Sequence, residues 1–554
     1  MGYLLRDFES FMHIINELKK NFTLEDQVVL IDSIEATENY GKTTFSAPVE
    51  LDGVIVINKE ITIGKALKLA NALKFNLYPV GTNKNWGYGS FNMSPGRPNV
   101  ILDLARLCKI TATDKELGLV TLGPGVTQQQ LYDFLVKHNW DYMVPVTGAG
   151  PEAGIVSNAL ERGYGITPHN DHFYACTALK AFIPHPELCE NQYESAVSAF
   201  DKSGSDFIDK SYKWGLGPYI DGIFTQSNLG IVSEMTIRLA PNPEHFSAFY
   251  LRVLNEEQFE ETVALVKDVL RNYAGIVGSV NIMDRRRLIS ITAENPNGFE
   301  SNDLMSEQQI KDIATENKLP HWLVVGSIYG DKEIVVATKR ALKRKAKLIG
   351  PVLFSDSKRI KAATHFLRFL PRIAFVEKIV SQLASLQEGT DIMLGIPNQV
   401  ALPLPYWRNP IIRPNKNEQL SPSKDNCGLL WYAPLIKMTS SSLDEFVRFI
   451  RQTTPKYGFE PLITFTNLKH DCVDSTVPIV FDLHQPEQIK NAHDCLNELI
   501  QKGADYGFVP YRLDVKQQQN LDGRHVFWQT TNLIKDALDP NKVLSPGRYN
   551  PKTN

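Results

Sequence analysis

A β-α-β pattern that runs into a glycine-rich loop constrains the fold of this chain most. The apolar run Val54–Ile57 is followed by an amphipathic helical segment, Ile63–Leu73, and by a second β-type run, Leu77–Val80. The loop Gly81–Gly89 follows at once, with glycines where the backbone can approach a ligand closely and φ can be positive. Backbone N–H groups in such a turn can hold a pyrophosphate. The loop fits neither the G-x-G-x-x-G nor the Walker A pattern, so taken alone it predicts only a turn.

The second half of the chain repeats a different pattern. A strand at Ala248–Leu254 precedes a helix capped by Asn255, and a strand at Leu429–Ile436 precedes a helix starting at Ser442. Further strands are expected near 462–466 and 477–481, and a closing helix runs from Pro486 to a stop at Gly503. Two such β-α-β-β-α units predict one antiparallel sheet covered by helices on one side. The polar stretch Asn295–Pro320 is expected to be irregular.

We therefore predict an α+β fold with two domains, because 554 residues exceed what one compact core accommodates. Pro241 and Pro243 mark the first boundary. The expected division is 1–242 for the first part of a ligand-binding domain, 243–504 for a cap domain, and 505–554 for a return to the first domain.

Charge and cysteine usage exclude several classes of function. The net charge is −3, with 59 basic and 62 acidic residues, so nucleic acid is not an expected partner. The basic run Lys339–Lys347 is expected to be the solvated face of a helix. Six cysteines form no C-x-x-C pair and no zinc spacing, so no metal site is expected. No apolar run reaches the roughly 18 residues of a membrane span, and Met1–Glu9 lacks the features of a signal peptide. We expect a cytoplasmic protein.

Several further motifs accompany the glycine-rich loop in order along the chain. They are Gly123–Thr127, Gly148–Gly163, Thr167–His172, Gln226–Val232 and the closing segment Lys535–Gly547. Together they resemble the vanillyl-alcohol oxidase / 4-cresol dehydrogenase (p-cresol methylhydroxylase, PCMH) family. The resemblance runs from about Val49 to Tyr549 and implies a PCMH-type FAD-binding fold with a cap domain.

The resemblance implies FAD as cofactor and assigns residues to its binding. The glycine-rich loop and the Gly148–Gly163 region would enclose the pyrophosphate and the isoalloxazine edge, while the segment after Asn228 would contact the adenine half. The expected cofactor-binding residues are Gly81, Thr82, Asn83, Asn85, Gly87, Gly89, Gly150, Asn158 and Ile231. Several of these can also be plain turn glycines and, for Ile231, a core residue.

Relatives in this family oxidise the carbon para to a phenol, and four residues resemble their catalytic set. Tyr88, Tyr511 and Arg512 would stabilise a phenolate, since phenolic donors and a permanent cation lower a neighbouring phenol's pKa. Asp171 would lie near flavin N5 as a base or as a stabilising charge. The alternatives are a core role for Tyr511, an ordinary ion pair for Arg512 and a turn role for Asp171. Two tryptophans, Trp407 and Trp431, resemble pocket-lining positions, where packing is an equally good interpretation.

The chain departs from the family where many relatives attach the flavin covalently. The attachment position falls near Ser475, and serine is not a linker in this family; only a shifted alignment would let His470 or Cys472 serve. We therefore expect FAD to be bound non-covalently. His169 and the stretch Ile183–Glu190 also differ from relatives.

These observations lead to a hypothesis about function. We expect an FAD-dependent oxidase or dehydrogenase that oxidises a small phenolic or aromatic substrate by hydride transfer to flavin N5. The alternatives are a tailoring enzyme for a non-phenolic secondary metabolite and a flavin-binding subunit without turnover. The resemblance adds a homo-oligomer and an electron-accepting partner protein as expectations, with no membrane or nucleic-acid partner.

Overall fold

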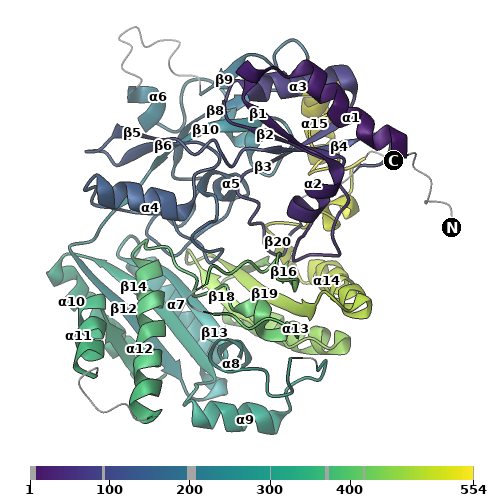
Figure 1. Ribbon diagram of the computed structural model, residues 1–554. Helices are drawn as coiled ribbons and strands as arrows, with labels where there is room; N and C mark the ends of the chain where they lie inside the picture. The colour runs from purple at the N-terminus through teal and green to yellow at the C-terminus, as the bar shows by residue number, and fades with distance from the viewer. Residues whose placement is uncertain are drawn as a thin grey trace.

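The computed structural model describes residues 8–89, 94–195, 207–299, 301–367, 374–415 and 418–552. In Figure 1 these residues form an upper half, which contains the purple N-terminal elements and the yellow helix α15, and a lower half built on a large sheet. The first seven residues, which the expectation about a signal peptide concerns, lie outside the described residues.

A four-stranded sheet, in the order β1-β2-β4-β3 among the described residues, carries the glycine-rich loop. β2, β3 and β4 run parallel, and β1 pairs antiparallel with β2 at the edge. The expected β-α-β unit is confirmed, and the loop leaves β3 at its carboxyl end, the usual place for a ligand beside parallel strands. The elements are α1 (Phe8–Asn21), β1 (Val28–Ile31), α2 (Ser33–Tyr40), β2 (Gly53–Ile57), α3 (Thr62–Leu73), β3 (Asn76–Val80) and β4 (Asn99–Asp103).

A second sheet in the upper half has five strands among the described residues, in the order β5-β6-β10-β8-β9, all paired antiparallel. Helix α4 begins with the predicted capping box, in which Thr127 and Gln130 bond each other's backbone N–H. The elements are β5 (Ile110–Asp114), β6 (Leu119–Leu122), α4 (Gln128–Lys137), α5 (Ile155–Leu160), β8 (Cys176–Phe182), β9 (Gln192–Glu194), α6 (Phe207–Ser211) and β10 (Ile231–Arg238). The short strands β7 (Tyr142–Met143) and β11 (Ala240–Pro241) pair with each other beside it.

The lower half is built on one sheet with nine strands among the described residues. Its strands pair antiparallel, as predicted. Its order is β15-β12-β14-β13-β18-β19-β17-β20, with β16 paired to β19. The strands are β12 (His245–Val253), β13 (Val277–Asp284), β14 (Trp322–Gly330), β15 (Val352–Ser355), β16 (Cys427–Tyr432), β17 (Pro434–Lys437), β18 (Thr464–Asn467), β19 (Cys472–Asp482) and β20 (Val509–Pro510).

Four helices cover one face of this sheet and form the largest apolar core with it. They are α7 (Phe259–Asn272), α10 (Lys332–Lys345), α13 (Ser440–Thr453) and α14 (Pro486–Asp505). Alternate strand residues such as Phe465, Val473 and Val477 point into that core. The intervening residues point to the opposite face, which we call the open face. The remaining helices are α8 (Arg285–Thr292), α9 (Glu307–Glu316), α11 (Ser357–Leu367), α12 (Ala374–Met393) and α15 (Val526–Leu538).

Three local predictions were wrong. Asn295–Pro320 contains helix α9, because Ser306 and Gln309 form a capping box and the side chains of Ile310 and Ala314 are buried. The strand expected at 429–436 is two strands, since β16 and β17 pair with different parts of β19. Gly503 lies inside α14, where a Cβ would come within 2.2 Å of the Tyr432 hydroxyl. Gly507, with φ +79°, follows the end of that helix instead.

The C-terminal segment returns to the upper half and is fixed there by a buried lysine. Lys535 in α15 bonds Asp539 at 2.7 Å and also donates to the carbonyls of Asn228 and Leu544. The backbone of Leu544 bridges to Leu77 in β3. Ser545 is thereby held beside the strand that carries the glycine-rich loop. The domain boundaries after residues 242 and 504 stay a proposal. Strand β20 lies in the returning segment, yet it pairs with β17 of the lower sheet.

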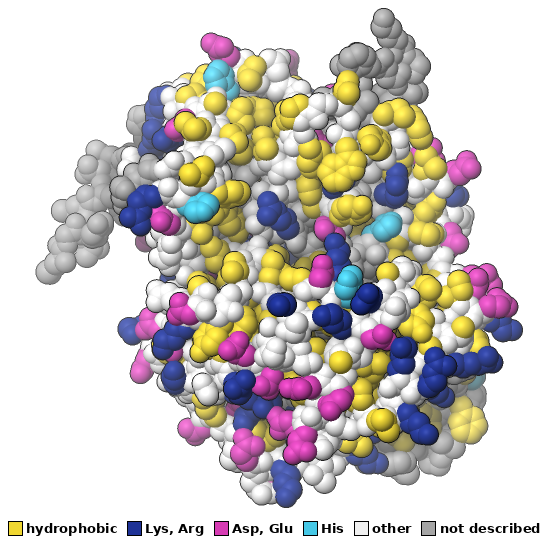
Figure 2. Space-filling view, turned by 180° about the vertical axis from the view of Figure 1, so that it is seen from behind, with side chains coloured by type: hydrophobic (Ala, Val, Ile, Leu, Met, Phe, Trp, Pro, Cys, Tyr) yellow, Lys and Arg dark blue, Asp and Glu magenta, His cyan; other side chains and the backbone are white. Residues whose placement is uncertain are grey.

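The surface carries charges of both signs. Figure 2 shows dark blue and magenta side chains interspersed over the lower half, with dark blue ones gathered on the side where α10 lies. In α10 and just beyond it, Arg340, Lys343, Arg344, Lys345 and Lys347 are exposed. The basic run is therefore a solvated helix face, as expected. None of the helices in the described ranges is long and apolar enough to cross a membrane.

Candidate active site

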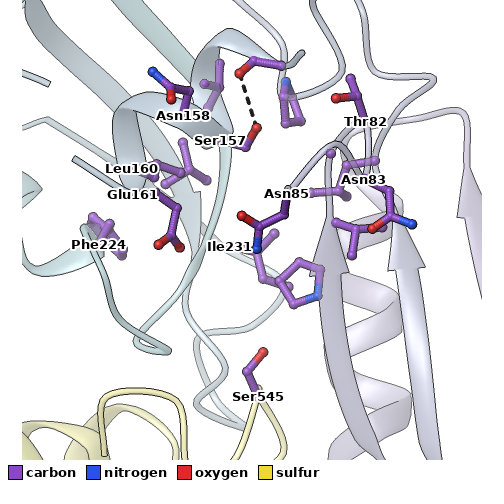
Figure 3. Close-up of a pocket in the computed structure, with 18 of the residues that line it drawn as sticks. Thr82, Asn83, Asn85, Ser157, Asn158, Leu160, Glu161, Phe224, Ile231 and Ser545 are labelled. Carbon is purple, nitrogen blue, oxygen red and sulfur yellow. Dashed lines mark hydrogen bonds between the residues drawn. The ribbon is translucent and has the colours of Figure 1, made fainter. Parts of the chain in front are cut away.

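A cavity opens where the glycine-rich loop, helix α5 and the C-terminal segment meet. It encloses about 1370 Å³ of empty space, its open mouth included. Figure 3 shows Asn85 of the loop, Ser157 and Glu161 of α5 and its C-terminal end, and Ser545 of the C-terminal segment arranged around this space. The walls mix small polar side chains with apolar ones such as Ile231, which suits a large ligand that has polar and aromatic parts.

Small residues bring the backbone close to the cavity. A Cβ on Gly154 would lie 2.7 Å from the Ser157 Oγ and 3.4 Å from the Thr82 Oγ1, and one on Gly81 would lie 3.0 Å from the Pro124 carbonyl. The Ser227 hydroxyl, also in the wall, is buried and has no hydrogen-bond partner among the described residues. A cradle without Cβ atoms and with a spare hydroxyl fits a phosphate-bearing cofactor such as FAD.

Six of the nine predicted cofactor-binding residues line this cavity. They are Gly81, Thr82, Asn83, Asn85, Asn158 and Ile231. The other three glycines have positive φ but pack against side chains outside the wall: Gly87 on Trp431, Gly89 on Val515 and Gly150 on Leu402. Other wall residues received no role from the sequence, notably Glu161, Ser545 and Arg548. The sequence offers a signal for Ser545, because this residue lies in the closing segment Lys535–Gly547, and Arg548 directly follows that segment.

An ion cluster joins the cavity to the second predicted site. The Glu161 carboxylate forms ion pairs with Arg512, whose Nε lies 3.0 Å from it, and with Arg548. Arg512 donates in addition to the Asn85 side chain at 2.8 Å, and Asn85 donates to the Gly89 carbonyl at 2.6 Å. The glycine-rich loop therefore holds Arg512 by a side chain, which ties the two predicted sites together.

The structure brings Tyr88, Tyr511 and Arg512 together in one cluster. The Arg512 guanidinium lies 4.1 Å from the centre of the Tyr88 ring. Burial raises the pKa of Tyr88 well above its ordinary value, and the contact with Tyr511 raises it further, while Arg512 opposes the shift. Burial also raises the pKa of Tyr511 to about 12. Both phenols therefore stay protonated and can donate hydrogen bonds to an anionic oxygen.

The structure adds Tyr164 and Asp474 to this cluster. The ring centres of Tyr164 and Tyr511 are 5.7 Å apart. Asp474 lies in β19, its side chain only 3% exposed, and its charge interacts with Tyr88, Tyr164 and Tyr511. Burial raises the pKa of this carboxyl to about 8, although Tyr164 opposes the shift. The alternation along 473–477 was the signal that could have found Asp474, because it puts this residue on the face opposite Val473 and Val477.

Comparisons with known proteins also point to an FAD-binding protein. Residues 51–184 match a family model described as an FAD binding domain. The chain is 29% identical to the 1'-carboxy-chondrochloren decarboxylase of Chondromyces crocatus over 91% of its length and 92% of that protein. It is 25% identical to the flavoprotein subunit of 4-cresol dehydrogenase (hydroxylating) of Pseudomonas putida, over 87% of this chain and 84% of that one. The crystal structure of p-cresol methylhydroxylase with substrate bound superposes with a TM-score of 0.82, at 22% identity, over 98% of both chains.

The chain contains an FAD binding domain at residues 51–184 and is similar to PCMH-type flavoproteins over nearly its whole length. The fold prediction is thereby confirmed, and the FAD binding domain supports FAD as the cofactor. Two further residues to which the sequence gave a role at the site, Asp171 and Trp407, lie apart from the tyrosine cluster.

Asp171 lies outside the tyrosine cluster. Its side chain is exposed, and a carboxylate oxygen accepts from the Tyr174 backbone N–H at 2.9 Å, which is the turn role considered above. Trp407 packs with Ile289, Met305 and Ile310 and donates to the Ala293 carbonyl. Trp431, in contrast, packs on Gly87 of the loop.

The position expected for a covalent flavin link faces away from the cluster. Ser475 is fully buried, lies opposite Phe465 on the helix-covered face, and donates to the Thr464 carbonyl at 3.2 Å. His470 is exposed in the turn between β18 and β19, and Cys472 is partly exposed at the start of β19.

Proposed function

We propose that this protein oxidises a small phenol that carries an alkyl substituent para to the hydroxyl, using FAD as electron acceptor. The observation that carries the proposal is the cluster of Tyr88, Tyr511 and Arg512 beside the flavin cavity, in which Arg512 belongs to both the cluster and the wall. Bound FAD supplies a two-electron acceptor that takes a hydride at N5.

The side chains of the cluster supply the rest of the chemistry. Tyr88 and Tyr511 donate hydrogen bonds to the phenolate oxygen, and the Arg512 cation lowers the phenol's pKa. The anion concentrates electron density on the para-substituted ring, which favours loss of a hydride from the benzylic carbon. Burial of the cluster strengthens each of these interactions, because they act in a medium of low dielectric constant.

Anaerobic mixing with 4-ethylphenol tests this function. The FAD-loaded protein should lose its visible flavin absorbance, and Arg512→Ala should slow that loss by at least about 100-fold, as removal of a transition-state charge partner does. The control is Arg524→Ala, since Arg524 is exposed and pairs only locally with Asp522. A wild-type flavin that no 4-alkylphenol reduces would contradict the proposal.

A second candidate is oxidation of a metabolite by loss of a carboxylate. The 29% identity to the 1'-carboxy-chondrochloren decarboxylase favours it. Aromatic acids should then release CO₂ as the flavin is reduced, whereas 4-ethylphenol should leave it oxidised. A third alternative, a flavin-binding subunit without turnover, predicts that neither class of compound reduces the flavin.

We further propose that FAD is held without a covalent bond. The buried, hydrogen-bonded hydroxyl of Ser475 on the helix-covered face supports this. After acid precipitation of the protein, the yellow colour should remain in the supernatant; colour in the pellet would contradict the proposal. A cytoplasmic location, a homo-oligomer and an electron-accepting partner protein remain predictions, as does the choice between oxidase and dehydrogenase.

A further inference from the structure

Asp474 occupies a defined place on the open face of the lower sheet. It lies opposite Thr466 of β18, and Thr466 lies opposite Asn281 of β13. Residues directly opposite each other in antiparallel strands have their side chains about 4.5–5.5 Å apart on the same face. Asn281, Thr466 and Asp474 therefore form a polar row that ends at the tyrosine cluster.

The carboxyl group at the end of this row is poorly satisfied. Neither oxygen of Asp474 has a well-aligned hydrogen-bond donor within the described ranges, although the Tyr164 hydroxyl lies against it. A buried acceptor without a good partner costs stability, so such a group needs a reason. A purely structural carboxyl would be expected to cap a helix or to pair with a cation, as Asp284 and Asp539 do.

The groups that face Asp474 come from three other segments. They are Tyr88 from the glycine-rich loop, Tyr164 from the segment after α5, and Tyr511 from the segment after β20. On the same strand, the charge of Asp474 contributes to raising the pKa of Cys472. Arg512, the nearest cation to Tyr88 and Tyr511, lies beyond these phenols. The phenols thus separate a potential base from the cation that would stabilise a phenolate.

We propose, building on the function proposed above, that Asp474 is the acceptor of the substrate's phenolic proton, with the Tyr164 hydroxyl as the bridge. The phenol O–H bond breaks and its proton passes to the Tyr164 oxygen, while the hydroxyl proton of Tyr164 passes to a carboxylate oxygen of Asp474. One O–H bond is lost at the substrate and one is gained at Asp474, so Tyr164 is unchanged. The negative charge moves from the carboxylate to the substrate oxygen, beside Arg512.

This role predicts a pH dependence. Only the ionised carboxyl can accept the proton, and the pKa of Asp474 is raised to about 8. The rate of flavin reduction should therefore rise about tenfold per pH unit at lower pH and level off above about pH 8. The phenols around it do not ionise in this range, because their pKa values are raised as well.

The test measures flavin reduction by 4-ethylphenol in the FAD-loaded wild type, Asp474→Asn and Tyr164→Phe. The measurements run from pH 6 to 9.5, so that they extend roughly two pH units to the acid side of the pKa of Asp474. The wild type should show the rise and the plateau. Asp474→Asn should be at least about 100-fold slower at the plateau and should lose the rise, since an amide accepts no proton. Tyr164→Phe should slow the reaction at every pH and keep the dependence. The control is Asp482→Asn, a buried carboxyl on the same strand that bonds His484 and Gln485; it should leave the profile unchanged.

The outcomes separate this inference from the function on which it rests. If 4-ethylphenol does not reduce the wild-type flavin, the proposed function fails. If it does, but the wild-type profile is flat or Asp474→Asn keeps the rise, the role of Asp474 is overturned.

A second measurement applies even where Asp474→Asn binds FAD poorly. Bound 4-nitrophenol reports its own ionisation by the visible colour of its anion. The wild-type protein should take up one proton for each 4-nitrophenolate anion that forms in the site. In Tyr164→Phe, fewer protons should be taken up per anion. Anion formation without proton uptake by the protein would also overturn the role of Asp474.

Discussion

The two faces of strand β19 both bury polar side chains, but these side chains differ in their hydrogen-bond partners. Ser475 and Asp474 are neighbours in sequence, with side chains 0% and 3% exposed. Ser475 lies between Val473 and Val477 in the helix-covered core, and its hydroxyl has a hydrogen-bond acceptor. Asp474 faces three phenols on the open face and has no well-aligned partner within the described residues. Burial alone therefore does not separate packing residues from candidate functional ones; the partners of the buried polar atoms do.

The same contrast explains where stability comes from in the lower half. The helix-covered face buries aliphatic and aromatic side chains, each worth about 1.5–3 kcal/mol. The open face buries polar groups, whose removal from water costs free energy unless hydrogen bonds compensate. We infer that packing on the helix-covered face stabilises the folded state and that burial of polar groups on the open face offsets part of this stabilisation.

A large effect on stability is expected on the helix-covered face, at Phe465. Its ring is fully buried, with ring centres of Phe446, Phe259 and Trp322 at 5.8, 6.0 and 6.3 Å. Phe465→Ala should lower the free energy of unfolding of the FAD-free protein by about 3–5 kcal/mol, because it leaves a cavity. Urea titration followed by tryptophan fluorescence measures this change.

The matched control for that variant is Phe527→Ala, since the Phe527 side chain is 62% exposed. It should change the free energy of unfolding by less than about 0.5 kcal/mol. A loss of similar size in both variants would mean that the helix-covered face is not the main source of stability.

The open face should make stability depend on pH. The ordinary pKa of an aspartate is 3.8 and that of Asp474 is raised to about 8, so between these values the folded protein binds a proton that the unfolded chain has lost. The free energy of unfolding should therefore fall as pH rises through this window, by at most about 1.4 kcal/mol per pH unit from this group. Asp474→Asn should lack this contribution, so its stability relative to the wild type should increase from about pH 4 to about pH 8.

Asp284 provides the comparison for that measurement, because burial raises its pKa only to about 6. In Asp284→Asn the stability difference from the wild type should stop changing above about pH 6. If the difference for Asp474→Asn also stops there, Asp474 is already ionised at neutral pH and the contrast between the two faces weakens.

Much of the fold could be predicted because its signals are local. Apolar runs, the Thr127–Gln130 capping box and the glycine-rich loop each depend on a few adjacent residues. Gly503 was misinterpreted because its role depends on the distant Tyr432, which leaves no room for a Cβ. Tertiary contacts of this kind are absent from a local pattern.

Part of the candidate site could be predicted from the resemblance of several ordered motifs. The structure brings Tyr88, Tyr511 and Arg512 together, whereas Asp171 forms a turn with the Tyr174 backbone. An aspartate serves turns and active sites equally well, so its type does not decide between them. Asp474 received no role from the sequence, because the resemblance directs attention to the neighbouring Ser475, although strand alternation puts Asp474 on the open face.

The smallest effect on stability is expected at Ser475. Ser475→Ala removes a hydroxyl that donates to the Thr464 carbonyl on the helix-covered face, which should cost about 1 kcal/mol in the free energy of unfolding. Because this hydroxyl points away from the tyrosine cluster, the absorbance of bound FAD and its rate of reduction should match those of the wild type. A shifted flavin spectrum in Ser475→Ala would show that this residue reaches the cofactor, and the assignment of β19's two faces to packing and to chemistry would then have to be reversed.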